Sequence, residues 1–122
     1  MNEVQVALRP PIIVWEPRNI ELFASIERAC EYLEPPDVNA GTPTAYDSEG
    51  RRLTLQVVEV PVRAFGRALW HVRRVRVVDC QREPLDAHEL RTILATALGV
   101  GPADTRPLAE LVTAAQERFG TT

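Results

Sequence analysis

The chain contains no lysine, only two cysteines and two histidines, and no long apolar run. Two cysteines are too few for a disulfide scaffold, and Cys30 and Cys80 fall in an expected helix and at an expected strand end, so we predict reduced thiols. The longest apolar run covers only a few residues, too short to span a membrane. Residues 1–8 carry Glu3 and lack the basic segment of a signal peptide. We therefore expect a cytoplasmic protein.

The length and composition predict a single domain over residues 1–122. A chain of 122 residues buries roughly two thirds of its unfolded surface, which is enough for a hydrophobic core without staples. The hydrophobic share of 45% and the charged share of 25% are ordinary for a globular protein.

Charge is sorted along the chain, and all 14 basic residues are arginine. Residues 1–50 hold nine acids and three arginines, a balance of −6, whereas residues 51–82 hold eight arginines and two acids, a balance of +6. Residues 83–122 return to −3. Charge separated by region is typical of a surface that recognises a charged partner.

The first half of the chain predicts a strand, a helix and a hairpin. The apolar run Ile12–Trp15 favours a buried strand. Asn19 is the expected N-cap of a helix over residues 20–33, in which Leu22, Ile26, Ala29 and Leu33 form one apolar stripe and Pro35-Pro36 end the helix. The sequence 37–43 is loop by composition. Residues 44–46 and 52–57 then flank a turn at Asp47–Gly50 and predict two antiparallel strands.

The second half predicts one more strand and two helices. Pro61 is expected to end the preceding strand, and residues 62–69 fit a loop or a helical turn equally well. Residues 70–79 are rich in valine and indicate a strand. Asp86 and Glu89 form a capping-box pattern for a helix that Gly99 closes, and Pro107 opens a last helix that ends at Gly120. The order β-α-β-β-β-α-α predicts an α+β fold: an antiparallel sheet of about four strands packed with three helices.

The sequence offers no constellation of residues that is typical of catalysis. His71, His88, Cys30 and Cys80 are too scattered for a zinc site. Cys30 lies on the apolar side of an acidic helix, and Cys80, although near Arg76 and Arg82, has no evident base, so inert thiols are expected. A phosphate-binding glycine loop and a serine nucleophile elbow are both absent. We expect no enzyme activity, no cofactor, no metal and no small-molecule substrate.

The arginine-rich block is a candidate for nucleic-acid binding. It contains Arg63, Arg67, Arg73, Arg74, Arg76 and Arg82, with Phe65 and Trp70 between them. Arginines of this kind contact phosphates while aromatic rings stack on bases. The acidic total charge of −3 argues against this function, because nucleic-acid-binding domains are commonly basic. Pairing of the arginines with acids of the same molecule is the alternative.

An acidic stretch is the second candidate surface. Six acids fall within 22 residues, namely Glu16, Glu21, Glu27, Glu31, Glu34 and Asp37, opposed by Arg18 and Arg28. Small acidic domains that mask a basic partner use such a surface to steer association. A helix kept soluble by its charge has the same pattern.

The segments 23–38 (FASIERACEYLEPPDV) and 45–53 (AYDSEGRRL) resemble a group of small bacterial proteins encoded beside polymorphic toxins of the Rhs or contact-dependent type. These proteins are regarded as the cognate immunity proteins of the toxins. The resemblance covers about a quarter of the chain. It implies an antitoxin that binds one secreted toxin domain, and it brings no catalytic residues.

From the residues and the resemblance together we predict a toxin-binding edge. It consists of Glu27, Glu31, Glu34 and Asp37, with Tyr32 or Tyr46 as an aromatic anchor. The alternatives are a nucleic-acid-binding regulator that uses the Arg63–Arg82 block and an adaptor or chaperone for a secreted effector. Membrane binding is not expected.

Overall fold

The computed structural model describes residues 8–101 and 104–120. The N-terminal residues from which we expected no signal peptide lie almost wholly outside this range. The strands are β1 (Ile12–Glu16), β2 (Asn19–Phe23), β3 (Thr44–Tyr46), β4 (Arg52–Ala64) and β5 (Arg67–Cys80). The helices are α2 (Ile26–Tyr32), α3 (Pro35–Asn39), α4 (Ala87–Leu98) and α5 (Leu108–Phe119).

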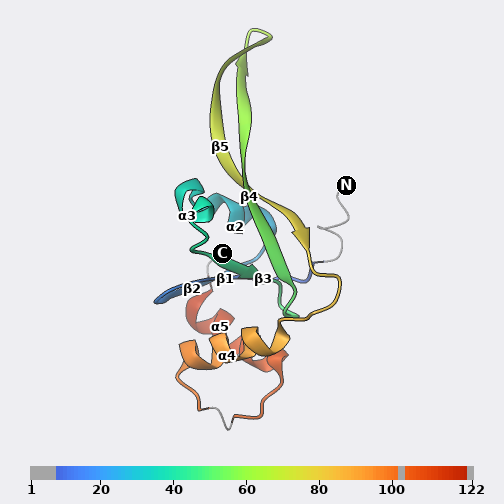
Figure 1. Cartoon of the computed structure of the whole chain (residues 1–122). Coiled ribbons are helices and arrows are strands. Elements are labelled where there is room, and N and C mark those ends of the chain that lie inside the picture. Colours follow the sequence, from blue (N-terminus) through green and yellow to red (C-terminus); the bar gives the residue numbers. More distant parts are fainter. Residues whose placement is uncertain (1–7, 102–103, 121–122) are drawn as a thin grey trace.

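The five strands form one antiparallel sheet in the order β2-β1-β3-β4-β5. Helices α2 and α3 lie on one face, and α4 and α5 lie on the other (Figure 1). The predicted α+β class is confirmed, although the sheet has one strand more than expected and the described residues form four helices. No helix in the described part of the chain is long and apolar enough to cross a membrane.

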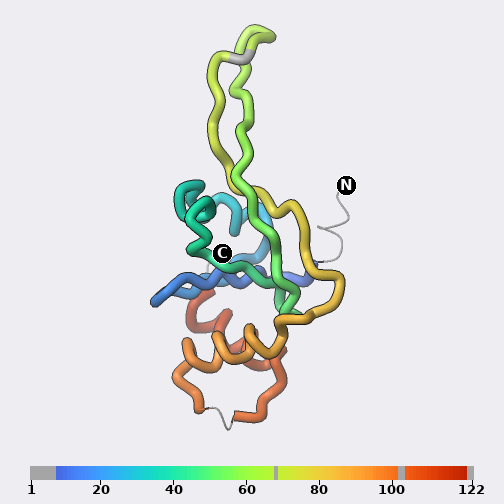
Figure 2. Tube along the Cα trace, viewed as in Figure 1, coloured from blue at the N-terminus to red at the C-terminus, as the bar shows by residue number. Residues whose placement is uncertain are grey.

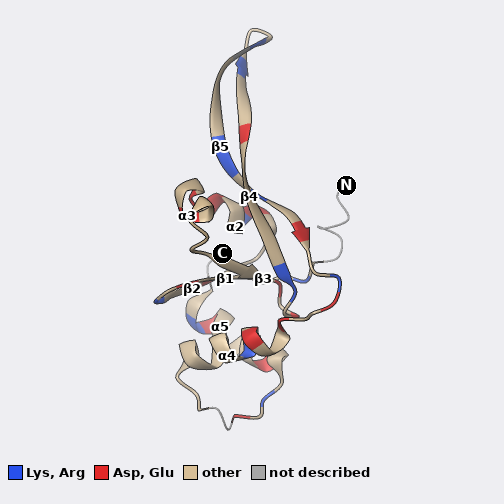
Figure 3. Cartoon of the chain, viewed as in Figure 1, with Lys and Arg blue, Asp and Glu red and all other residues tan. Residues whose placement is uncertain are grey.

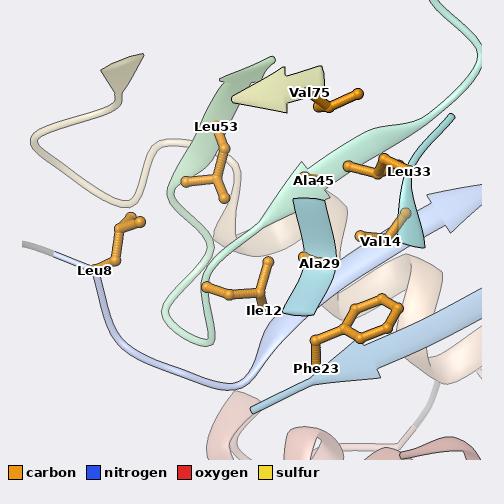
Figure 4. Packing of buried hydrophobic residues seen from close by; sticks show 9 residues of the cluster. All are labelled: Leu8, Ile12, Val14, Phe23, Ala29, Leu33, Ala45, Leu53 and Val75. Atoms are coloured by element: carbon orange, nitrogen blue, oxygen red, sulfur yellow. The ribbon is translucent and has the colours of Figure 1, made fainter. Parts of the chain in front are cut away.

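The sheet separates two hydrophobic cores. Ile12 and Val14 of β1 pack with Ala29 and Leu33 of the α2 side (Figure 4), whereas Ile13 between them packs on the α4–α5 side. Because successive side chains of a strand point to opposite faces, a strand buried on both faces has a continuous apolar sequence. The apolar run at residues 12–15 is therefore the buried strand that we predicted.

The helix expected over residues 20–33 is wrong in its first third. Asn19 begins β2 instead, which turns back from β1 through Pro17 and Arg18, the latter in a left-handed conformation with φ 70°. Ile20 and Leu22 enter the core on the α4–α5 side, and Phe23 enters the other core, so the period is that of a strand. The helix begins later, where the Ser25 hydroxyl accepts a hydrogen bond from the Arg28 N–H at 3.2 Å.

Two prolines have effects that differ from the expected ones. Pro35 does follow the end of α2, but it also opens α3, because the first turn of a helix does not require its N–H. Pro61 does not end a strand: β4 continues to Ala64. In the register of the sheet β3 pairs with β4 only at Leu53 and Arg52, so Pro61 lies in a segment whose outer edge has no partner strand.

Residues 62–69 are neither a loop nor a helical turn. They contain the end of β4, the two-residue turn Phe65-Gly66 and the start of β5. Both turn residues have positive φ, 55° and 72°, which is the conformation that matches the twist of a two-residue hairpin. Figure 2 shows the chain running out to this turn and straight back. The result is a long hairpin that projects far beyond the rest of the fold.

The loop expected over residues 37–43 is wrong at its start, because α3 covers Pro35–Asn39. The remaining turns agree with the structure, apart from one cap. The turn after β3 contains Gly50 with φ 93°, and α4 ends at Gly99 with φ 73°. Asp86 precedes α4, but its carboxylate accepts from the Gln81 amide at 2.8 Å rather than from the helix. The capping box is therefore absent. The sequence also predicts a turn at Gly101-Pro102, between α4 and α5, which extends outside the described residues.

Candidate protein-binding surfaces

Four carboxylates from three elements lie around one exposed tyrosine. They belong to Glu16 at the end of β1, Glu21 in β2, and Glu34 and Asp37 at the start of α3. Partial burial raises the pKa of Glu16, and the negative charges of Asp37, Glu34 and Glu21 raise it further. The four groups therefore act on one another electrostatically. We call these carboxylates and Tyr32 the acidic surface.

Tyr32 is the aromatic centre of the acidic surface. Its side chain is 39% exposed, and its ring lies 5.1 Å from the ring of buried Phe23, tilted by 40°. The amide of Asn19 donates a hydrogen bond to its hydroxyl at 3.0 Å. Burial raises the pKa of Tyr32, and the charges of Glu16 and Glu21 contribute in the same direction. The ring is thus held on the core while one side remains accessible, which suits an anchor for a protein partner.

The structure divides the six residues predicted for the binding edge. Tyr32, Glu34 and Asp37 belong to the acidic surface. Glu27 and Glu31 line a groove between α2 and β5 that Glu34 also borders, and the opposite wall of this groove contains Arg73 and Arg74. Glu16 and Glu21, which we counted in the acidic stretch but did not assign to the edge, complete the surface. These two residues lie close together because β1 pairs with β2, a strand that the sequence pattern had indicated as part of a helix.

Tyr46 does not lie on this surface. Its side chain is fully buried on the opposite face of the sheet, in the core formed with α4 and α5. Its hydroxyl donates a hydrogen bond to a carboxylate oxygen of Glu89 at 2.9 Å. Tyr46 is therefore not exposed as a partner anchor, and Tyr32 is the tyrosine that the geometry leaves for this role.

Four arginines of the arginine-rich block lie in the outer part of the β4–β5 hairpin, whereas Arg76 lies nearer its base and Arg82 follows β5. We call residues 58–74 the arm. It holds Arg63, Arg67, Arg73 and Arg74 against Glu59, a net charge of +3. Figure 3 shows the charged residues along the hairpin and on the helices near its base. None of the four arginines is in an ion pair with a described residue. The predicted alternative of pairing within the molecule is therefore not found in the described part of the arm.

The arm has one apolar and one polar face. Paired residues of an antiparallel ribbon point to the same side, so Val60 with Val72 and Val62 with Trp70 form an apolar strip, which Val58 extends. The other face carries Glu59 opposite Arg73 and Pro61 opposite His71. Trp70 is 54% exposed. No described helix covers the apolar strip, because α2 and α3 reach only the base of the hairpin (Figure 1).

The cysteines and histidines provide no reactive centre in the described residues. Burial raises the pKa of the Cys30 and Cys80 thiols, which opposes thiolate formation. Both histidines are exposed, His71 on the arm and His88 at the start of α4. Among residues 8–101 and 104–120 no three potential metal ligands come together.

An apolar cleft of about 570 Å³ lies beside the β1–β2 turn. Its walls include Trp15, Ile20, Ile93 and Phe119, with Arg18 at the turn.

No protein-family model, curated protein or solved structure matches the chain.

Proposed function

We propose that this chain is an immunity protein that binds a cognate secreted bacterial toxin domain and neutralises it by protein–protein contact. The observation that carries the proposal is the acidic surface, where carboxylates from β1, β2 and α3 surround the exposed ring of Tyr32. The resemblance of segments 23–38 and 45–53 to immunity proteins supports the same function. The complementary partner is a toxin domain with a basic face.

The acidic surface has the two parts that such an interface needs. The carboxylates steer a basic partner toward the correct face and raise the association rate, an effect that falls with ionic strength. Tyr32 provides an apolar ring whose conformation is fixed before binding by Phe23 and Asn19. Because little side-chain freedom is then lost on binding, more of the contact free energy remains as affinity. Binding of this kind blocks the partner by covering it.

The first experiment is affinity capture of the tagged chain from the lysate of its own bacterium, washed at high salt, with protein and nucleic acid both analysed. The expected result is one stoichiometric polypeptide, the C-terminal domain of a much larger secreted protein. Production of that domain alone should stop bacterial growth, and production of this chain with it should restore growth.

The surface is tested by reversing two of its charges, Glu21→Lys with Glu34→Lys. We expect slower association with the captured toxin domain and poorer protection of growth. The matched control is Glu83→Lys with Glu117→Lys, which changes the net charge equally at exposed positions away from the acidic surface. If wild-type chain binds the domain without protecting cells, the function is wrong. If both double variants protect as well as wild type, the surface is wrong. A partner that binds only when unfolded indicates the adaptor or chaperone alternative.

The unpaired arginines of the arm favour nucleic-acid binding as a second candidate function. The discriminating measurement is the affinity for oligonucleotides as a function of salt. A nucleic-acid-binding chain shows a linear fall of log affinity with log salt concentration, because cations are released from the phosphates. A stoichiometric protein partner with no retained nucleic acid would leave this candidate without support.

A further inference from the structure

The arm exposes more apolar surface than its own fold explains. A two-stranded hairpin is at best marginally stable in water unless something packs on its apolar face. Here the strip Val58, Val60, Val62, Val72 and Trp70 faces away from the polar side. The four valines are half-buried, Trp70 is exposed, and α2 and α3 reach only the base of the hairpin. The exposed fractions are 53% for Leu69, 54% for Trp70 and 99% for Phe65. An apolar face of this kind is typical of a surface that a partner covers.

The turn at the tip of the arm is strained, and no packing within the chain offsets this strain. Phe65 adopts φ 55°, a left-handed conformation that is unfavourable for a residue with a side chain. Asparagine or glycine fits such a turn position without this cost. Because the Phe65 side chain is 99% exposed, no packing inside the chain compensates for the strain. The ring at the tip therefore points to a contact outside the chain.

The charge of the arm determines which partner it fits. With a net charge of +3 and no ion pair among described residues, the arm favours an acidic surface. It disfavours pairing with a second arm, since like charges would then lie opposite one another. A nucleic acid is the less favoured partner, because neither face of the arm is uniformly basic. Arg73 lies on the polar face beside Glu59, and Arg74 lies on the valine face.

The acidic surface of the same chain has the complementary properties. In the described residues none of Glu16, Glu21, Glu34 and Asp37 forms an ion pair, and Tyr32 exposes an aromatic ring among them. Two copies of the chain therefore present equal numbers of unpaired basic arms and unpaired acidic surfaces. Arginine and aromatic residues are also the types enriched at protein interfaces.

We propose that the arm is the docking element for a second copy of this chain, in which the arm of one copy lies on the acidic surface of another. The apolar strip and Phe65 supply buried contact area, and the arginines pair with the carboxylates. The inference does not depend on toxin binding. If both occur, a basic toxin domain competes with the arm for the acidic surface, so the associated form keeps that surface covered until the toxin arrives.

The test is sedimentation velocity of the purified full chain across a wide concentration range, at low and high salt. We expect a mass above that of the monomer that rises with concentration and falls with salt. The arm-reversed variant, Arg63→Glu with Arg67→Glu, and the surface-reversed variant, Glu16→Lys with Glu34→Lys, should each remain monomeric alone. An equimolar mixture of the two should associate again, because each reversed charge meets its complement.

The control variant is Arg52→Glu with Arg82→Glu, which changes the net charge like the arm-reversed variant but at the other end of the hairpin. It should associate as wild type does, and circular dichroism verifies that all variants are folded. A wild-type chain that stays monomeric at every concentration overturns the proposal. So does a surface-reversed variant that associates like wild type, since arm-to-arm pairing would then be responsible. Association that requires co-purified nucleic acid, seen in the ultraviolet spectrum, overturns it too.

Discussion

The Tyr46 hydroxyl donates a hydrogen bond to the Glu89 carboxylate over 2.9 Å and so joins β3 to the first turn of α4. The tyrosine is fully buried, whereas Glu89 is exposed. Burial and the bond to Glu89 both raise the pKa of Tyr46, so the hydroxyl stays protonated and remains a donor throughout the neutral range. The contact is thus a polar link at the edge of the α4–α5 core.

Tyr46→Phe removes this link without changing the shape of the core. We expect the free energy of unfolding to fall by about 1 kcal/mol, the usual net contribution of one hydrogen bond. Tyr32→Phe is the matched control, and it should cost less because water can replace its partner at an exposed hydroxyl. Urea denaturation of both variants measures the two effects. Equal losses of unfolding free energy in the two variants would show that the buried hydrogen bond contributes no more than the exposed one.

Asp47 organises the turn between β3 and β4. Its fully buried carboxylate accepts hydrogen bonds from the N–H groups of Arg9, Glu49 and Arg51 and from the Arg51 guanidinium. Asp47→Ala leaves these donors without their acceptor, so we expect a loss of about 3 kcal/mol in the free energy of unfolding. Glu49→Ala removes a half-exposed carboxylate that pairs with Arg51 and with Arg9, and it should cost about 1 kcal/mol or less. Thermal unfolding measures the loss of stability in both variants, and similar losses would contradict this account.

Glu16 should make stability depend on pH. Because burial and neighbouring carboxylates raise its pKa, the folded chain holds the proton more tightly than the unfolded chain does. Ionisation of Glu16 therefore destabilises the fold, and the effect grows as the pH rises from the ordinary carboxyl pKa through the raised one. Glu16→Gln should raise Tm at neutral pH, and this gain should shrink as the pH is lowered. The control Glu117→Gln removes the same charge on the exposed side of α5, and an equal gain in Tm in this variant would contradict the account.

The spacing of the apolar residues predicted most elements. It failed where a strand residue and the following helix residues together have the spacing of one helix. Leu22, Ile26, Ala29 and Leu33 are spaced as on one helix, yet Leu22 belongs to a strand and packs on the opposite core from Ala29. The spacing could not show this, because the closing of the sheet by β2 depends on contacts with β1. Tyr32 and its neighbouring acids were predicted as a surface. That Glu16 and Glu21 also belong to this surface could be seen only from the register of the sheet.

Proline and turn rules failed for a related reason. Pro61 is a strand-breaker in the middle of a sheet, but the arm has no further strand to pair with, so the missing N–H costs nothing there. Phe65-Gly66 is not a usual hairpin sequence, and the strained conformation of Phe65 is visible only in the backbone angles. The sequence therefore did not predict that this segment forms a projecting hairpin, although its arginines were identified.

Phe65→Asn separates the stability of the arm from its proposed contact. Asn-Gly is the preferred pair for a two-residue turn in which both residues have positive φ, so the substitution should relieve about 1 kcal/mol of strain. In dilute solution, where the chain is monomeric, amide hydrogen exchange near Val62 should become slower. Phe65→Ala is the control, because it removes the same ring but keeps the strain, and its exchange should not slow. At high concentration both variants should associate more weakly than wild type. Undiminished association of both would remove Phe65 from the proposed contact.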